Sequence, residues 1–190
     1  MVAERFTGGM PRDRTDELTS GWLASILVGW GSDARTMVLA GPDPVELVAG
    51  STIHVFTSQD PGAVPQSPSR NKKLLRQLLA WIHETVPGGS WMPVTGIDAQ
   101  NGHFEQGVGV LNWSRSRAVE AGTRWGQLTI YELCDKELRV ISCPTDSQTT
   151  SAVTGVAARK WPAEVSAATI DPAMIERWWD TYQQVWPAEG

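Results

Sequence analysis

Cysteine is scarce in this sequence: Cys134 and Cys143 are the only two among 190 residues. They lack the paired spacing of a structural zinc site, which excludes a zinc-finger type of domain. A two-residue hairpin turn at Asp135-Lys136 would place Cys134 opposite Glu137. Cys143 would then face Leu128, and the two thiols could not meet in a disulfide. We therefore expect two free thiols, as is usual in a reducing compartment.

Positive charge and long apolar runs are also in short supply. The 16 Lys and Arg residues are outnumbered by 21 Asp and Glu residues, which gives a net charge of -5. This balance argues against general nucleic-acid binding and against an anionic membrane surface as a partner. The longest apolar-rich segment, residues 22–30, is too short to cross a bilayer, and the charged residues near the N-terminus are not those of a signal peptide. We expect a soluble cytoplasmic protein without a membrane partner.

Tryptophan, in contrast, is abundant. Apolar residues make up 41% of the sequence and charged residues 19%, which is enough for a hydrophobic core, and the length of 190 residues favours a single domain over 1–190. Large aromatic rings mostly fill cores and interfaces, and this is our interpretation of the tryptophans. They lie at positions 22, 30, 81, 91, 113, 125, 161, 178, 179 and 186.

The N-terminal part of the chain predicts a helix followed by a strand. Apolar residues recur at helical spacing between Thr15 and Trp30, and Gly31 can end that helix. The next β-rich run is Thr36–Ala40, which a Gly-Pro-Asp-Pro turn closes. The apolar positions of the expected helix are Leu18, Trp22, Leu23, Ile26, Leu27 and Trp30.

The centre of the chain predicts two capped helices between strands. Ser67-Pro68 combines an N-cap hydroxyl with proline at the first helical position, and a leucine-rich stripe up to Ile82 suits burial. Ser114 caps a second helix that ends at Gly126 and has a face of small residues, suited to close packing on a sheet. The expected strands are Ser51–Thr57, Trp91–Asp98, His103–Leu111, Gln127–Cys134 and Glu137–Cys143.

The C-terminal part predicts an irregular segment and a last helix. Residues 144–169 are rich in Ser, Thr, Ala and Pro, which favours an irregular crossing segment. Asp171-Pro172 then opens a helix with apolar residues at helical spacing. This stripe either docks on the domain or forms a partner-binding face. It consists of Ile175, Trp178, Trp179, Tyr182 and Trp186.

The order of the central elements predicts the fold class. It is β-α-β-β-α-β-β, preceded by a helix and a strand and followed by a helix. No internal repeat is visible, which argues against a solenoid. We expect an α+β fold with a mostly antiparallel sheet and helices packed on one of its faces.

The segment from Asn101 to Val110 is the most informative about a functional site. It predicts a tight turn that leads into a strand with two different faces. One face, which suits a core, carries Phe104, Val108 and Val110. The other face carries His103, Glu105, Gly107 and Gly109. The glycines leave room for a close approach to the backbone beside an imidazole and a carboxylate, so we expect a site on this second face.

His103 and Glu105 are the candidate catalytic residues. They could form a general acid–base pair, with Glu105 as the base, or provide two ligands of a metal ion. They could equally be a hydrogen-bonded surface pair at the edge of the sheet. No third ligand is obvious, although His54 and Glu132 are available, and we predict no cofactor. Nucleophile-elbow, phosphate-loop and dinucleotide-binding motifs are missing from the sequence.

Asn71 and Gln127 are further candidates for contacting a ligand. Asn71 lies in the first turn of its helix, where free N–H groups and the helix dipole favour an anion, but it could instead bond the preceding loop. Gln127 follows a helix end, and its amide can contact either a polar ligand or backbone groups of a loop. Glu132 needs a partner if it faces the interior.

Several segments, in a consistent order, resemble one bacterial family. They are Val55–Pro61, Ser67–Asn71 with Leu74 and Leu78 behind it, Gly96–Asp98 leading to His103–Glu105, and Arg124–Gln127 before Ile130. On these motifs, residues 51–143 resemble the family known as domain of unknown function 3293. The resemblance implies a family-like core at 51–143, with 1–50 and 144–190 as extensions packed on it, and carries Asn71, Glu105 and Gln127 over as shared residues. Family members commonly have Asn-Pro in place of Asp60-Pro61 and an aromatic residue in place of His103, and the resemblance implies no activity.

Three functions are compatible with the sequence. We expect a binding module in which Asn71, His103, Glu105 and Gln127 line a site for a small polar or anionic ligand or a protein partner. The first alternative is a hydrolase-type enzyme that uses Glu105 as base and His103 as acid or metal ligand. The second is an interaction protein that acts through its tryptophan-rich surface.

Overall fold

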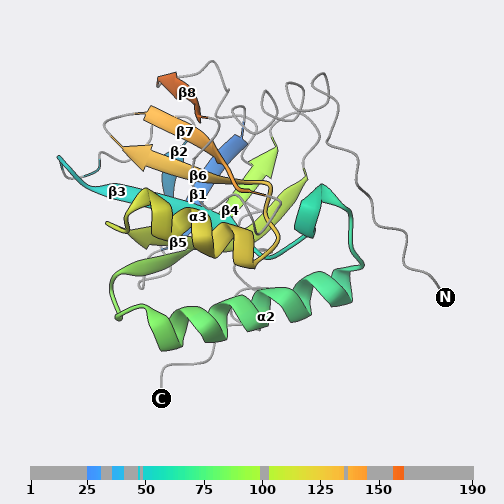
Figure 1. Cartoon of the computed structure of the whole chain (residues 1–190). Helices are drawn as coiled ribbons and strands as arrows, with labels where there is room; N and C mark the ends of the chain where they lie inside the picture. The colour runs from blue at the N-terminus through green and yellow to red at the C-terminus, as the bar shows by residue number, and fades with distance from the viewer. Residues whose placement is uncertain are drawn as a thin grey trace.

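The computed structural model describes residues 25–30, 36–40, 47, 49–98, 103–134, 137–144 and 156–160. Their helices and strands are shown in Figure 1. In chain order they are β1 (Ser25–Trp30), β2 (Thr36–Ala40), β3 (Thr52–Thr57), the 3-10 turn η1 (Pro61–Ala63), α2 (Pro68–Thr85), β4 (Trp91–Asp98), β5 (Phe104–Leu111), α3 (Arg115–Arg124), β6 (Thr129–Cys134), β7 (Glu137–Ser142) and β8 (Val156–Lys160).

The strands of the described residues form one antiparallel sheet. It has eight strands in the order β2-β1-β4-β5-β3-β6-β7-β8. The central order, β3-α2-β4-β5-α3-β6-β7, is the β-α-β-β-α-β-β order expected from the sequence. The prediction of an α+β fold with an antiparallel sheet is therefore confirmed for this part of the chain.

Both helices pack on the same face of the sheet, as predicted (Figure 1). The leucines and the isoleucine on the inner side of α2 are at most 1% exposed and meet small residues of α3 and the valines of β5 in one hydrophobic cluster. The rings of Trp81, Trp113 and Trp125 close this cluster between the helices, with Trp81 edge-on to the other two. These tryptophans fill the core, which agrees with our interpretation of them.

The opposite face of the sheet has a hydrophobic cluster of its own, because the sheet curls. This cluster joins Leu27 of β1 to Leu133 of β6 and Leu138 of β7, although β4, β5 and β3 lie between β1 and β6 in the sheet. The hydroxyl of Tyr131 in β6 donates a hydrogen bond to Ser25 Oγ in β1 at 2.9 Å. The curvature thus brings distant strands together and buries their inner side chains, and neither of the described helices lies on that face.

The helix boundaries follow from the predicted caps. The hydroxyls of Ser67 and Ser114 accept hydrogen bonds from the N–H groups of Arg70 and Arg117, each at 3.3 Å. Gly126 follows α3 with a φ of 73°, the left-handed conformation that glycine adopts at low cost. Proline at the start of α2 and glycine after α3 therefore delimit the two helices as the sequence indicates.

The predicted helix over Thr15–Trp30 is wrong for its last six residues, which form strand β1, and residues 15–24 lie outside the described part. Ile26, Leu27 and Val28 are fully buried, because β1 pairs with β2 and β4 and is covered on both sides. A strand buried on both faces is a continuous apolar run, and such a run is compatible with helical spacing as well.

Of the two predictions for the C-terminal part, one is wrong and the other is not tested by the described residues. The irregular segment expected over residues 144–169 contains strand β8, which pairs antiparallel with β7 and extends the sheet. Backbone pairing with a neighbouring strand thus overrides a weak local preference. The last helix, with Trp178 and Trp179, lies outside the described residues and stays a prediction.

The two cysteines form no disulfide, as expected, and both are buried. The register places Cys134 opposite Glu137, and the Cys143 N–H donates to the carbonyl of Leu128 at 2.7 Å. Burial raises the pKa of the Cys143 thiol to about 11, so this thiol is protonated and unreactive at neutral pH.

No helix among the described residues is long and apolar enough to cross a membrane.

The two faces of β5 differ as predicted, but its glycines are not open to a ligand. Val108 and Val110 enter the helix-side core, whereas Phe104, near the start of the strand, is 41% exposed rather than part of the core. A Cβ at Gly107 would collide with the backbone carbonyl of Phe56, and one at Gly109 would lie 2.9 Å from a methyl group of Val94. The backbone of β3 and neighbouring side chains occupy the space that we expected to be free.

Substitution of Gly107 tests this close approach of β3 and β5. We expect Gly107→Ala to lower the free energy of unfolding by roughly 1–3 kcal/mol, because backbone atoms cannot move aside as a flexible side chain can. Urea denaturation measures the change. Gly88→Ala is the control, since nothing lies within 4 Å of a Cβ at that position. Equal stability of the two variants would contradict the close approach.

Candidate functional site

The site is organised by residues 58–66, a loop between β3 and α2 that we call the β3–α2 loop. Asn71 in α2 accepts a hydrogen bond from the Asp60 N–H at 3.1 Å. After the end of α3, Gln127 Nε2 donates a hydrogen bond to the carbonyl of Gln59 in the loop at 3.1 Å. The Gly62 N–H of the loop donates to the carbonyl of Gly126 at 2.7 Å. The start of α2 and the end of α3 therefore hold the loop from two sides.

The carboxylate of Asp60 is fixed in direction by this loop. One oxygen, Oδ1, accepts hydrogen bonds from the Gln66 N–H at 2.7 Å and from Asn71 Nδ2 at 2.9 Å. The other oxygen, Oδ2, lies 3.8 Å from His103 Nε2. Asp60 has a φ of 42°, so the backbone turns sharply where this carboxylate is presented.

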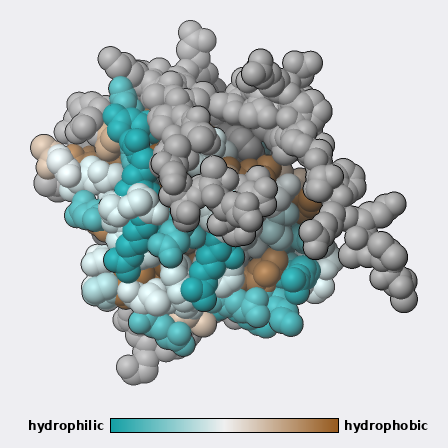
Figure 2. All heavy atoms as spheres, in the orientation of Figure 1, coloured by the Kyte–Doolittle hydropathy of each residue, from teal (hydrophilic) through white to brown (hydrophobic). Residues whose placement is uncertain are grey.

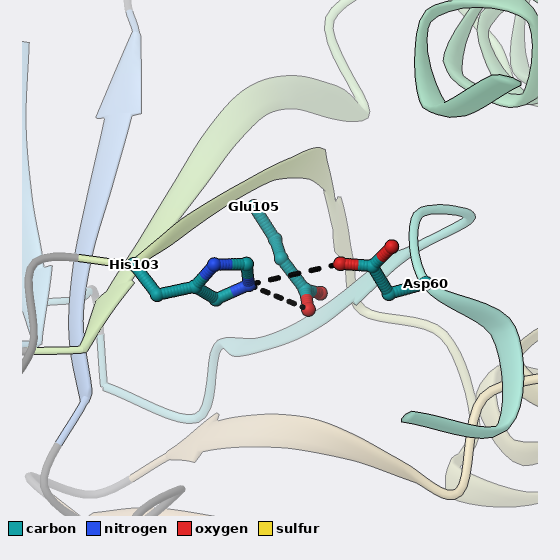
Figure 3. A group of neighbouring side chains, drawn as sticks. All are labelled: Asp60, His103 and Glu105. Carbon is teal, nitrogen blue, oxygen red and sulfur yellow. Dashed lines mark hydrogen bonds and ion pairs between the residues drawn. The ribbon is translucent and has the colours of Figure 1, made fainter. Parts of the chain in front are cut away.

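Asp60, His103 and Glu105 meet at the rim where this loop passes the start of β5; we call them the acid–histidine triad. Their side chains point toward one another from the loop and from β5 (Figure 3). His103 Nε2 lies 3.4 Å from Glu105 Oε1. The side chains are 12% exposed for Asp60, 32% for Glu105 and 56% for His103, so solvent reaches the triad from the histidine side.

The carboxylates around His103 favour its charged form. The hydrogen bond to Glu105 raises the pKa of His103 above its usual value, partial burial opposes this, and the charges of Glu105, Asp60 and Asp98 add to the rise. The two carboxylates of the triad therefore stabilise positive charge on His103.

The four residues predicted for the site form two pairs with different roles. His103 and Glu105 are adjacent and partly open to solvent. Asn71 and Gln127 lie behind them and bond the loop, the alternative role we gave to each. The sequence analysis did not include Asp60 in the site, because Asp-Pro is an ordinary start of a turn. Its signal was a carboxylate in the family-like segment Val55–Pro61, the one that precedes the segment with Asn71.

The two residues considered as further metal ligands lie elsewhere, on the helix side of the sheet. Glu132 is 4% exposed and receives two hydrogen bonds from Arg115, at 2.6 and 2.9 Å, and one from Arg139 at 3.0 Å. His54 Nε2 lies 3.0 Å from the same carboxylate. Glu132 thus faces inward and has the partners that such a position requires.

Burial and hydrogen bonding act in opposite directions on the pKa values of the buried Glu132 and His54. Burial alone would raise the pKa of Glu132, but the hydrogen bonds from Arg115, Arg139 and His54 outweigh it and hold the pKa at about 2. Burial lowers the pKa of His54 although the bond to Glu132 favours its charged form. A neutral His54 donates from Nε2, which leaves Nδ1 as a buried acceptor without a partner among the described residues. The group stabilises the fold and is not open to a ligand.

The fold and the triad define an α+β domain with an acid–histidine site at the rim of a curled sheet. Residues 56–130 match the sequence model of the family described as "Protein of unknown function (DUF3293)". The matched segment contains the whole triad, Asn71 and Gln127. Searches of curated proteins and of solved structures find no significant match. The resemblance predicted from the sequence is therefore confirmed.

The ionisation of His103 tests the geometry of the triad. We expect Asp60→Asn to lower the pKa of His103, because it removes a negative charge while its Oδ1 can still accept the bonds that hold the loop. NMR titration of the imidazole protons measures both proteins. A raised folded pKa stabilises the fold below the unfolded value of 6.5, and this contribution is lost as the pH rises through the folded pKa. Identical titration curves would contradict the contact.

The dependence of stability on acidic pH tests the contribution of the buried Glu132. Glu132 contributes stability above its unfolded pKa of 4.5, and the contribution is lost as the pH falls to about 2. We expect Glu132→Gln to lower the free energy of unfolding at neutral pH by roughly 2–3 kcal/mol and to flatten its dependence on pH in that window. Guanidinium denaturation at several pH values measures this. Glu84→Gln, an exposed position on α2, is the control and should retain the wild-type dependence.

Proposed function

We propose that this protein is a binding module for a small ligand that carries positive charge or several hydrogen-bond donors. The observation that supports this is the acid–histidine triad. It places two carboxylates and an imidazole within reach of one small group, at a position that solvent also reaches. This convergence supplies the polar contacts of a binding site, whereas catalysis would require further groups.

The charge of the triad favours a cationic ligand over an anionic one. Asp60 and Glu105 are acidic, and Asp98 adds negative charge near His103. An anion would meet like charges, and among the described residues no Lys or Arg side chain is a cause of the shift in the pKa of His103. The anionic ligand considered from the position of Asn71 therefore loses its support, since both ends of that amide already bond Asp60.

The two alternative functions have weaker support. A hydrolase could use Glu105 as base and His103 as acid, and their 3.4 Å contact is compatible with this. A cysteine nucleophile is excluded among the described residues, because both of their thiols are buried. For the interaction protein, Figure 2 shows a mostly hydrophilic or neutral described surface, with hydrophobic residues in small separate spots. The described part of this face thus shows no broad hydrophobic patch. Trp178, Trp179 and Trp186, on which this hypothesis depends, lie outside the described residues.

Thermal unfolding with charged probes tests the proposed function. We expect putrescine, spermidine and agmatine to raise the Tm of the wild-type protein by several degrees at saturation, and phosphate and citrate to have no such effect. The measurements are made in EDTA, which removes metal ions, and at matched ionic strength, because screening weakens contacts between exposed charges.

A double variant of the triad and a matched control test whether the rise in Tm comes from amines bound at the triad. Asp60→Asn with Glu105→Gln should abolish the rise in Tm, because the variant keeps the shape of the triad and loses its charge. Glu84→Gln with Glu120→Gln removes the same amount of charge from exposed positions on α2 and α3 and should leave the rise intact. Stabilisation by the anions, or by amines equally in both double variants, would contradict the proposal.

A further inference from the structure

We infer that the acid–histidine triad is a binding site for one divalent transition-metal ion, with Zn²⁺ as the best fit. The inference rests on the proposed function and narrows its ligand from positive groups in general to a metal ion. Asp60 Oδ2, His103 Nε2 and Glu105 Oε1 are the three ligand atoms. Among the residues that the structure describes, no other place brings three potential metal ligands together.

The kinds of donor atom favour a metal such as zinc. The triad offers one imidazole nitrogen and two carboxylate oxygens. Magnesium and calcium prefer oxygen ligands alone, whereas imidazole together with carboxylate is a usual ligand set of zinc. Thiolate ligands, which would favour Cu(I), are missing from the triad.

The distances between the donor atoms agree with this ion. Ligand atoms at roughly 2.0–2.2 Å from a tetrahedral zinc ion are about 3.3–3.6 Å from one another. His103 Nε2 lies 3.4 Å from Glu105 Oε1 and 3.8 Å from Asp60 Oδ2, and all three ligand atoms lie within 4.8 Å of one another. The first distance fits a shared zinc ion, and the second exceeds the tetrahedral spacing by about a few tenths of an ångström.

Neighbouring residues and the strand geometry orient the three ligand side chains before an ion binds. Asn71 and the Gln66 N–H bind Oδ1 of Asp60, which directs the other oxygen to the triad. Metal sites commonly orient their carboxylate ligands by such hydrogen bonds from outside the coordination sphere. His103 and Glu105 stand on the same face of one chain segment, because side chains alternate along a strand.

Solvent completes the site. The side chains of His103 and Glu105 are 56% and 32% exposed, so the outer side of the triad is open to water. Three protein ligands and one open position are the arrangement of catalytic rather than structural zinc sites. The chain's own residues therefore bind and orient the ion, and a water molecule or a small ligand can occupy the remaining position.

Isothermal titration calorimetry with ZnCl₂ on the full chain, freed of metal by EDTA and dialysed, tests the inference. The titration is made at about pH 8, where protons compete less for the histidine. We expect a stoichiometry of one ion per chain. Asp60→Asn, His103→Gln and Glu105→Gln should each weaken the affinity more than about tenfold. His83→Gln, which removes another exposed histidine on α2, should retain it.

A second measurement keeps the test independent of variant stability. In the wild-type protein, Zn²⁺ should shift the NMR signals of the His103 ring and leave those of His83 in place. Absence of zinc binding, or equal affinity in the wild-type protein and the three triad variants, would overturn the inference. The amine titrations in EDTA are unaffected by that outcome, so loss of the zinc site alone leaves the proposed function standing, and loss of both removes it.

Discussion

The hydrogen bonds that hold the β3–α2 loop between the two helix ends are the constraint on which the site depends. Asn71 at the start of α2 and Gln127 after the end of α3 both bind backbone groups of this loop, from positions far apart in the sequence. Because both helices pack on one face of the sheet, their ends can meet at a single loop. The loop in turn directs the carboxylate of Asp60 toward β5. The packing of the two helices on the sheet therefore also determines where the carboxylate of Asp60 lies at the rim.

The protein contains two groups of carboxylate and histidine, and burial gives them opposite properties. Glu132 is surrounded by two arginines and His54, so its hydrogen-bonding capacity is used within the fold. Removal of such a carboxylate affects stability. In the triad, Asp60 and Glu105 face one histidine and solvent, and no arginine neutralises them among the contacts that the structure describes. Among the described residues, the triad thus sets two carboxylates against one histidine at a rim that solvent reaches.

Local signals predicted most of the central elements. The serine caps, Pro68 and Gly126 set the ends of the helices. The alternation along β5 correctly placed Val108 and Val110 in the core, although Phe104 is exposed. Predictions failed where long-range pairing decides the conformation. Strand β1 is apolar on both sides because it lies inside the sheet, and β8 forms because β7 offers an edge. Neither neighbour is visible in the sequence of the segment itself.

The sequence by itself determined the order of helices and strands between β3 and β7, the lack of a disulfide between the two cysteines, and the pairing of His103 with Glu105. Each of these follows from residues close together or from the strict alternation of a strand. The tertiary structure alone decided that Asp60 completes the triad and that Glu132 does not. It also decided that β3 and Val94 fill the space beside the glycines of β5. These outcomes depend on how the sheet curls and on where the helix ends meet the loop. Such distances arise from packing among distant segments, for which no local pattern in the chain carries a signal.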